Sequence, residues 1–426
     1  MRNFVFTAAV VLAATATSLP AQSAQPLTLQ ECIRLAESVP SPVSIARQER
    51  DIATRELTQA RSGFLPQSRL VNGFTYNSPL SGSRDVVSFL PLNGIREYSS
   101  LFSVNQEFDT SGRLRAEMAR ARVAQDITAA GLALTQRDLR RAVALAYYRA
   151  LLTRRIVRIV EDTLAESQSF EKRSKLLFEG GEAAQADVVK ASAQVAFLQQ
   201  ARNAADMDAK LANQELASFW TREVADTLPL ADLLEDTPPP PEAEATQSSP
   251  FLKRFEFNLL DAQKRGFQAD ARRAHSALLP QLGFGFQYGI DSTSFRIHDR
   301  GYAAIVNLNI PIFDWHKARA ATEQARLKAQ QVDTSRAISE RTFSKEYQSA
   351  LTRIKQLYEQ ISLTRQQAKL AEEDLKLSRI RYEGGEGLAL DVVTSQNQLA
   401  QARSNYYTTM ANYLNAKADL EVATGR

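Results

Sequence analysis

The sequence predicts a mainly helical fold made of two internal repeats, each with one β-hairpin and one pair of long coiled-coil helices. Three observations support this prediction: a recurring motif, two segments with a period of two, and two long stretches without proline. The motif is FEGGEAAQADVV at residues 178–189 and YEGGEGLALDVV at 382–393, about 204 residues later. A duplication of this length favours an architecture with internal pseudo-symmetry.

The composition excludes several classes of function. The 426 residues include 52 basic and 48 acidic ones, a net charge of +4 that does not indicate nucleic acid as a partner. The three histidines show no metal-ligand spacing, and one cysteine cannot form an intramolecular disulfide. No catalytic constellation or cofactor motif is found, so we do not expect an enzyme, a cofactor or a metal site.

Residues 1–24 are predicted to be a secretory signal peptide. Arg2 precedes a short apolar run that ends near Ala14, and small residues before Ala24 fit a cleavage site. The apolar run is shorter than the ~20 residues that a membrane-spanning helix needs. We expect Cys32 to be a free, buried thiol and not a lipid anchor, because no lipoprotein cleavage motif precedes it.

Prolines delimit one helical segment at the start of each repeat. Residues 25–66 are expected to form N-terminal helices, the second of which begins at Ser41-Pro42 and ends before Pro66. Residues 250–280 should form the matching helix of the second repeat, starting at Ser249-Pro250. Proline fits the first turn of a helix and cannot continue one.

Two segments alternate between apolar and polar or small residues, which predicts β-hairpins at 67–108 and 281–313. The second is the clearer, with Phe284, Phe286 and Tyr288 between glycines and a glutamine. The returning strand should carry an apolar face from Tyr302 to Ile312.

Long helix pairs are predicted at 109–229 and 314–426, each with an uninterrupted rod of roughly 100 Å. Their return helices keep a seven-residue spacing, which indicates a coiled coil rather than a plain surface helix. The spaced residues are Ala191, Leu198, Ala205, Ala212 and Phe219, and Val392, Leu399, Tyr406, Tyr413 and Leu420. Residues 230–249, with four consecutive prolines, should be an extended connector without a packed core of its own.

Four amphipathic strands in an exported protein suggest a transmembrane β-barrel. A barrel in the outer membrane needs at least about eight strands, so this one must be shared between chains. Two chains would give a filled bore, whereas three would give twelve strands and leave a lumen.

The order of helix, hairpin, long helix, glycine turn and return helix, given twice, resembles the TolC family of outer membrane efflux proteins. The resemblance covers essentially the whole mature chain, and the two glycine-turn motifs carry it most specifically. It implies a homotrimer with a 12-stranded barrel in outer-membrane lipid and a helical tunnel in the periplasm. Such a duct serves an inner-membrane pump of RND, ABC or MFS type, or type I secretion, through a periplasmic adaptor protein.

The same resemblance implies roles for individual residues at the periplasmic tip. Asp391 corresponds to an aspartate that rings the closed entrance, and Tyr382 and Asp187 to a pair that ties the inner coiled coil to the outer one. The adaptor would dock on the tip turns at Gly180, Gly181, Gly384 and Gly385. Gly387 and Thr394 depart from TolC, which has arginine and a second aspartate there.

Two alternatives stay open at this stage. The glycines could be plain turn residues and both aspartates simple helix caps. The whole chain could be a periplasmic coiled-coil scaffold or adaptor without a channel, with its strands in a small soluble domain.

Overall fold

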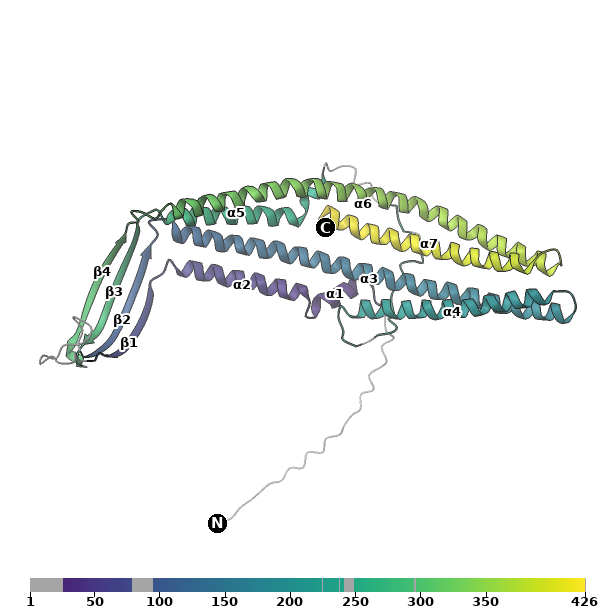
Figure 1. Ribbon diagram of the computed structural model, residues 1–426, viewed down its shortest axis with the longest axis horizontal. Coiled ribbons are helices and arrows are strands. Elements are labelled where there is room, and N and C mark those ends of the chain that lie inside the picture. Colours follow the sequence, from purple (N-terminus) through teal and green to yellow (C-terminus); the bar gives the residue numbers. More distant parts are fainter. Residues whose placement is uncertain are drawn as a thin grey trace, which may run out of the picture.

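The protein is an elongated body with a β-sheet at one end and two helical hairpins that reach the other end (Figure 1). The structure, a computed structural model, describes residues 26–78, 95–223, 225–236, 238–240, 249–294 and 296–425. The predicted signal peptide lies outside these residues, as does most of the loop of the first hairpin. Among the described residues, no helix combines the length and hydrophobicity needed to cross a membrane.

Four antiparallel strands form one sheet in the order β1-β2-β3-β4. They are β1 (Gln67–Tyr76), β2 (Arg96–Phe108), β3 (Gln281–Ser292) and β4 (Arg300–Asn309). The pairings of Leu70 with Phe102, Phe102 with Tyr288 and Tyr288 with Tyr302 place these side chains on one face. The opposite face carries small and polar residues such as Ser103 and Gly285. The predicted alternation is therefore confirmed across all four strands.

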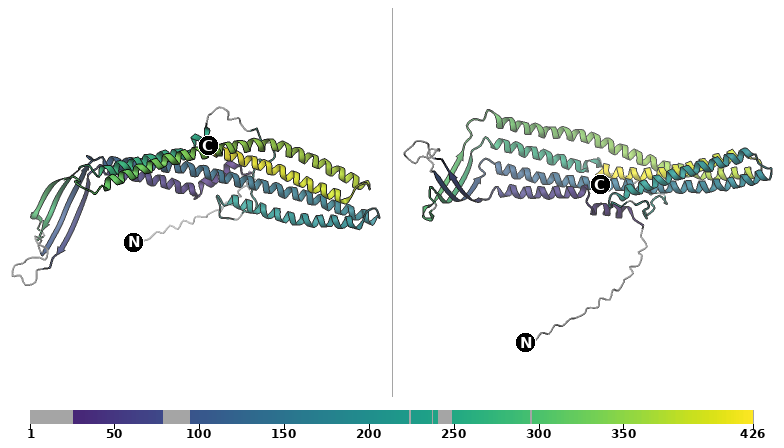
Figure 2. Two further views of the ribbon diagram at one scale, coloured as in Figure 1. Left: turned by 45° about the horizontal axis from the view of Figure 1, so that its top comes forward. Right: turned by 60° about the horizontal axis from the view of Figure 1, so that its bottom comes forward.

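Next to the sheet, four helices lie side by side in one layer, in the order α2, α3, α5 and α6 (Figure 2). They are α2 (Pro42–Ser62), α3 (Arg113–Glu179), α5 (Phe255–Ser276) and α6 (Lys317–Glu383). In the half away from the sheet, α4 (Gln185–Ala217) packs on α3 and α7 (Ala389–Thr424) packs on α6. Both long helices contain 67 residues, as the two proline-free stretches predicted.

The predicted seven-residue seams are buried. Ala191, Leu198, Ala205 and Ala212 of α4 are at most 8% exposed, and Val392, Leu399 and Tyr413 of α7 at most 4%. Tyr406 and Leu420 are half-buried, whereas Phe219 lies beyond the end of α4. Within each hairpin, the seam therefore holds the return helix against the long helix: α4 against α3, and α7 against α6.

The main core lies midway along the body, where α1 (Leu29–Ser38) crosses α3. The hydroxyl of Tyr147 donates to the backbone oxygens of Leu27 and Ala231 at 3.1 and 2.6 Å. Cys32 is buried and free as predicted, and burial raises the pKa of its thiol to about 11.

Three sequence-based details need correction. The connector is not a bare spacer, because Leu230 and Leu234 are buried in this core. The helix expected from Pro250 is present but begins later, at Phe255 of α5. Residues Pro250–Lys253 form a separate 3-10 turn, η1, and Arg254 between the two is extended. The strand β4 ends at Asn309, so Ile310 and Ile312 lie in the crossing to α6 and not in the strand. A second 3-10 turn, η2 (Ile297–Asp299), precedes β4.

Candidate functional site at the helical tip

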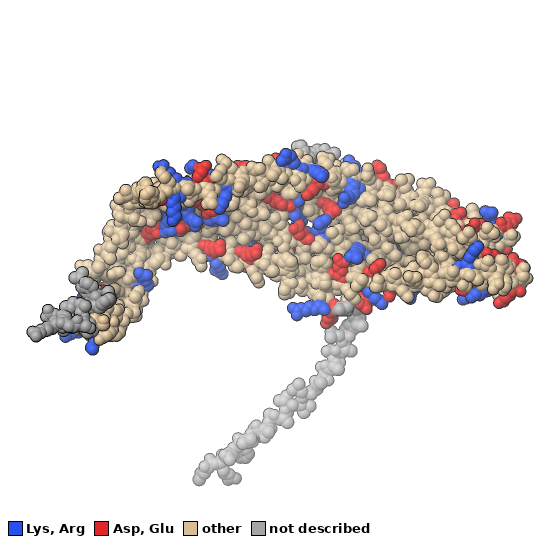
Figure 3. Space-filling model, in the orientation of Figure 1, with Lys and Arg blue, Asp and Glu red and all other residues tan. Residues whose placement is uncertain are grey.

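Both helical hairpins turn at the end of the body that lies farthest from the sheet (Figure 1). The first turn joins α3 to α4 and the second joins α6 to α7. Acidic and basic side chains both gather at this tip (Figure 3). The four glycines that the sequence singled out are all exposed there.

The two turns have the same backbone hydrogen bonds. In the first, the N–H of Gly181 donates to Phe178 and that of Glu182 to Leu177, at 3.0 and 2.8 Å. In the second, Gly385 donates to Tyr382 and Glu386 to Arg381, at 3.1 and 3.0 Å. This is the Schellman pattern, which satisfies the last carbonyl groups of a helix.

The glycines within each pair have different roles. Gly181 and Gly385 adopt φ values of +79° and +77°, a region that strains residues with a Cβ atom. Gly180 and Gly384 keep right-handed helical angles, and a Cβ atom there would meet its nearest neighbours at 3.5 and 3.4 Å. Only the second glycine of each pair is therefore required by the turn itself.

Asp391 is exposed and stands in the first turn of α7. Its carboxylate accepts a hydrogen bond from the backbone N–H of Leu388 at 3.3 Å, which satisfies one free N–H at the start of the helix. The helix-cap interpretation therefore holds for Asp391, and it leaves the exposed carboxylate at the tip.

Asp187 differs from the expectation in two ways. In the described part of the chain its carboxylate makes no hydrogen bond or ion pair, so it neither caps α4 nor binds Tyr382. As an acidic residue in the first turn of α4 it still interacts favourably with the helix dipole.

Tyr382 is 7% exposed and joins α6 to α3. Its hydroxyl donates to the Oγ of Ser174 at 3.2 Å, and its ring lies 5.0 Å from the ring of Phe170. The equivalent Phe178 of the first repeat is 44% exposed and has no hydroxyl. Only one repeat therefore forms this contact.

Further polar contacts connect the two hairpins near the tip. Buried Ser167 of α3 donates to the side chain of Gln396 on α7 at 2.8 Å, and Gln194 of α4 donates to Asn397 at 2.7 Å. Arg379 of α6 and Glu166 of α3 form an ion pair at 3.1 Å. The sequence pattern did not predict these contacts between the hairpins, nor the contact of Tyr382 with Ser174. The one available signal was that Ser174 recurs as Ser378 at the repeat spacing of 204 residues.

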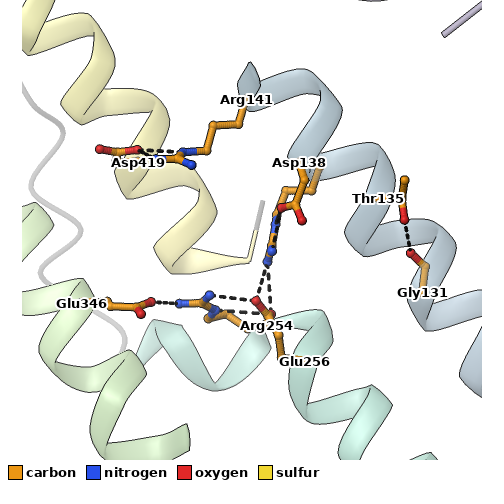
Figure 4. A network of polar contacts seen from close by, with 9 residues as sticks. Gly131, Thr135, Asp138, Arg141, Arg254, Glu256, Glu346 and Asp419 are labelled. Atoms are coloured by element: carbon orange, nitrogen blue, oxygen red, sulfur yellow. Dashed lines mark hydrogen bonds and ion pairs between the residues drawn. The ribbon is translucent and has the colours of Figure 1, made fainter. Parts of the chain in front are cut away.

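A second polar network lies midway along the body, where η1 and α5 meet α3, α6 and the end of α7 (Figure 4). Arg254, 6% exposed, pairs with Glu256 and Glu346 at 2.7 and 2.6 Å. Arg137 of α3 also pairs with Glu256, at 3.0 Å. Burial would raise the pKa of Glu256, but hydrogen bonds from Arg254 and Arg137 lower it below its ordinary value.

Comparisons with known proteins identify the family. The model of the outer membrane efflux protein family matches residues 42–221 and 245–426, which is most of the chain. The chain belongs to the outer membrane efflux protein family. OpmQ of Pseudomonas putida, named as a pyoverdine export outer membrane protein, is 22% identical over 330 residues, covering 77% of this chain and 70% of OpmQ.

Solved structures of outer membrane channels share the fold. The CmeC channel of Campylobacter jejuni superposes with a TM-score of 0.80 at 14% identity, over 93% of this chain and 85% of CmeC. The open state of the MtrE channel from Neisseria gonorrhoeae superposes with a TM-score of 0.81 at 19% identity, over 93% of this chain and 88% of MtrE. This outer membrane efflux protein is thus an efflux channel of the outer membrane with its helical tunnel in the periplasm, as the resemblance predicted. Its relatives are transport channels, not enzymes.

Proposed function

We propose that three copies of this chain form an exit duct, with a 12-stranded barrel above a helical tunnel. The support is that the chain leaves matching surfaces without a partner. All ten residues of both edge strands, β1 and β4, are exposed. An unpaired edge within a membrane is unstable, so β1 of one copy would pair with β4 of the next.

The helices carry a second set of unpartnered surfaces. Leu363, Leu370 and Leu377 of α6 follow a seven-residue spacing and are 55–64% exposed. Phe197 and Leu211 of α4 are also exposed, at 60% and 52%, and are separated by two such intervals. A regular apolar stripe outside the chain's own seams is typical of a coiled-coil contact with another copy.

The assembly can be tested by the mass of the protein extracted in detergent. A trimer is expected, and a stable monomer or dimer would contradict the proposal. Leu370→Glu should dissociate the trimer, since it places a charge in the apolar stripe. Lys369→Glu, which changes an exposed neighbour, is the matched control and should leave the trimer intact.

At the tip, we propose that the paired turns contact a periplasmic adaptor, which links the duct to an inner-membrane pump of RND, ABC or MFS type or to type I secretion. Gly180→Leu and Gly384→Leu would add bulk at the contact and preserve the turns, because these positions keep helical angles. Export should be lost while the trimer persists. Normal export by the double variant would restrict the turns to chain reversal.

A gate at the same tip is part of this proposal. Three exposed Asp391 carboxylates would surround the tunnel entrance, and Tyr382 would hold the α6–α7 hairpin against α3. The alternative of a soluble scaffold or adaptor is not supported, because the chain belongs to a family of outer membrane channels.

A further inference from the structure

A basic groove crosses the helical layer at its sheet-proximal end, far from the tip. It lies between the beginnings of α3 and α6 and the end of α5, and has a volume of about 930 Å³. Its wall starts at Ser111, three residues after β2 ends at Phe108. The groove is therefore next to the point where the chain leaves the sheet.

The wall carries four basic side chains and one carboxylate, Asp333. The basic residues are Arg115, Lys264, Arg272 and Arg326, and His275 lies beside them. Lys264 pairs with this carboxylate at 2.7 Å. Arg272 and His275 are exposed and form no hydrogen bond or ion pair with any described residue through their side chains. Arg326 has only an exposed Glu323 at 3.7 Å, a pair that contributes little.

The helix ends near the groove do not account for its charge. Asp109 accepts hydrogen bonds from the backbone N–H groups of Leu114 and Arg115, and Asp314 accepts one from Ala318. Asp109 also forms an ion pair with the side chain of Arg115 at 2.7 Å. These aspartates occupy matching places in the two repeats and satisfy the starts of α3 and α6. The positive charge that lacks a close partner among the described residues therefore comes from Arg272 and Arg326.

Large apolar side chains stand at the crossing that leads into α6. Ile312, Phe313 and Trp315 are 94%, 65% and 84% exposed. Tryptophan at the end of membrane strands is typical of the interface between lipid and water. With the strands in the membrane barrel proposed above, the groove would lie at the depth of lipid headgroups, so this step rests on the proposed function.

We propose that this groove binds phosphate groups, with Arg272 and Arg326 as the main ligands. Arginine is well suited to phosphate because its planar guanidinium donates two parallel hydrogen bonds. Two sources can supply the phosphate: the headgroup of an anionic phospholipid, or a soluble polyvalent anion. The inference goes beyond the export function and does not depend on a pump or adaptor.

The test uses the full-length protein in phosphate-free detergent and one double variant, Arg272→Gln with Arg326→Gln. Arg273→Gln with Lys328→Gln is the matched control, since both residues neighbour the ligands in sequence but do not line the groove. Pyrophosphate binding is measured by calorimetry. Lipid retention is measured by native mass spectrometry after exchange into phosphatidylglycerol or phosphatidylcholine.

The groove variant should bind about tenfold more weakly than wild type, and the control should match wild type. Loss of pyrophosphate binding alone identifies a soluble anion, and loss of phosphatidylglycerol retention alone identifies the lipid. The proposal is wrong if the wild-type protein binds neither probe. It is also wrong if both variant pairs weaken binding equally, because the effect would then be net charge.

Discussion

The hydroxyl of Tyr382 on α6 donates a hydrogen bond to Ser174 on α3, 208 residues away in the sequence. The contact is buried and joins the second hairpin to the first just above the tip. It occurs once per chain, because the first repeat has Phe178 at the equivalent position. This contact is therefore one of those that join the two hairpins, and it is asymmetric between them.

Removing this hydrogen bond should loosen the tip. Tyr382→Phe and Ser174→Ala should each lower stability by about 0.5–1.5 kcal/mol, and the double variant by little more than one of them. Thermal unfolding measures the stability, and the conductance of single channels in planar bilayers should rise if the contact restrains the entrance. Additive losses would show that the two side chains do not interact.

The two glycines of each tip turn should respond differently to alanine. Gly181→Ala and Gly385→Ala should each cost about 1–2 kcal/mol, because their φ angles are positive. Gly180→Ala and Gly384→Ala should be neutral or slightly stabilising, since alanine favours the helical angles found there. Thermal unfolding of the four variants separates the pairs, and equal losses would contradict the assignment.

Asp391→Asn tests whether the tip carboxylate acts on ions. If three copies surround the entrance, the variant should reduce cation selectivity and block by multivalent cations in planar bilayers. The amide oxygen can still accept the hydrogen bond from Leu388, so stability should change little. Asp187→Asn is the control. Unchanged selectivity and block would limit Asp391 to its role as a helix cap.

The buried network at Glu256 predicts a loss of stability in acid. Because the folded-state pKa of Glu256 lies below its ordinary value of 4.5, its contribution is fully present above that value and is lost as the pH falls below it. Glu256→Gln should destabilise the protein at pH 7 by about 1–2 kcal/mol, since the largely buried Arg254 and Arg137 lose a charged partner. The loss is limited because Arg254 keeps Glu346 and Arg137 keeps Asp138.

The same variant should also lose less stability on acidification than wild type. Glu49→Gln, an exposed change on α2, should keep the wild-type pH profile. Thermal unfolding across the acidic range measures both. A profile of Glu256→Gln that parallels wild type would show that other carboxylates cause the acid sensitivity.

Local patterns predicted most of the fold. Alternation predicted the sheet face from Phe284 to Tyr288, and the seven-residue spacing predicted the buried seam through Val392 and Leu399. Each signal repeats within a few residues, so it can be read without knowing what lies opposite. The glycine pairs were likewise identified, although only the backbone angles distinguish Gly181 from Gly180.

Contacts between distant segments could not be predicted in this way. The partner of Tyr382 was expected at Asp187 and is Ser174, because the choice depends on how α3 and α6 are rotated against each other. The break at Arg254 had no local signal either. Arg254 makes ion pairs there with Glu256 and with Glu346 on α6, and the second partner lies 92 residues away in the sequence.

The equal lengths of α3 and α6 restrict how the chain can change in evolution. One residue inserted into the part of α3 that packs on α4 would move its end by ~1.5 Å and rotate it by roughly 100°, which would misalign the seam with α4 and the contact at Ser174. A tolerated change in reach would have to add or remove about two helical turns in both rods and in both return helices. The distance from the sheet to the tip can thus change only when α3, α4, α6 and α7 all change length together.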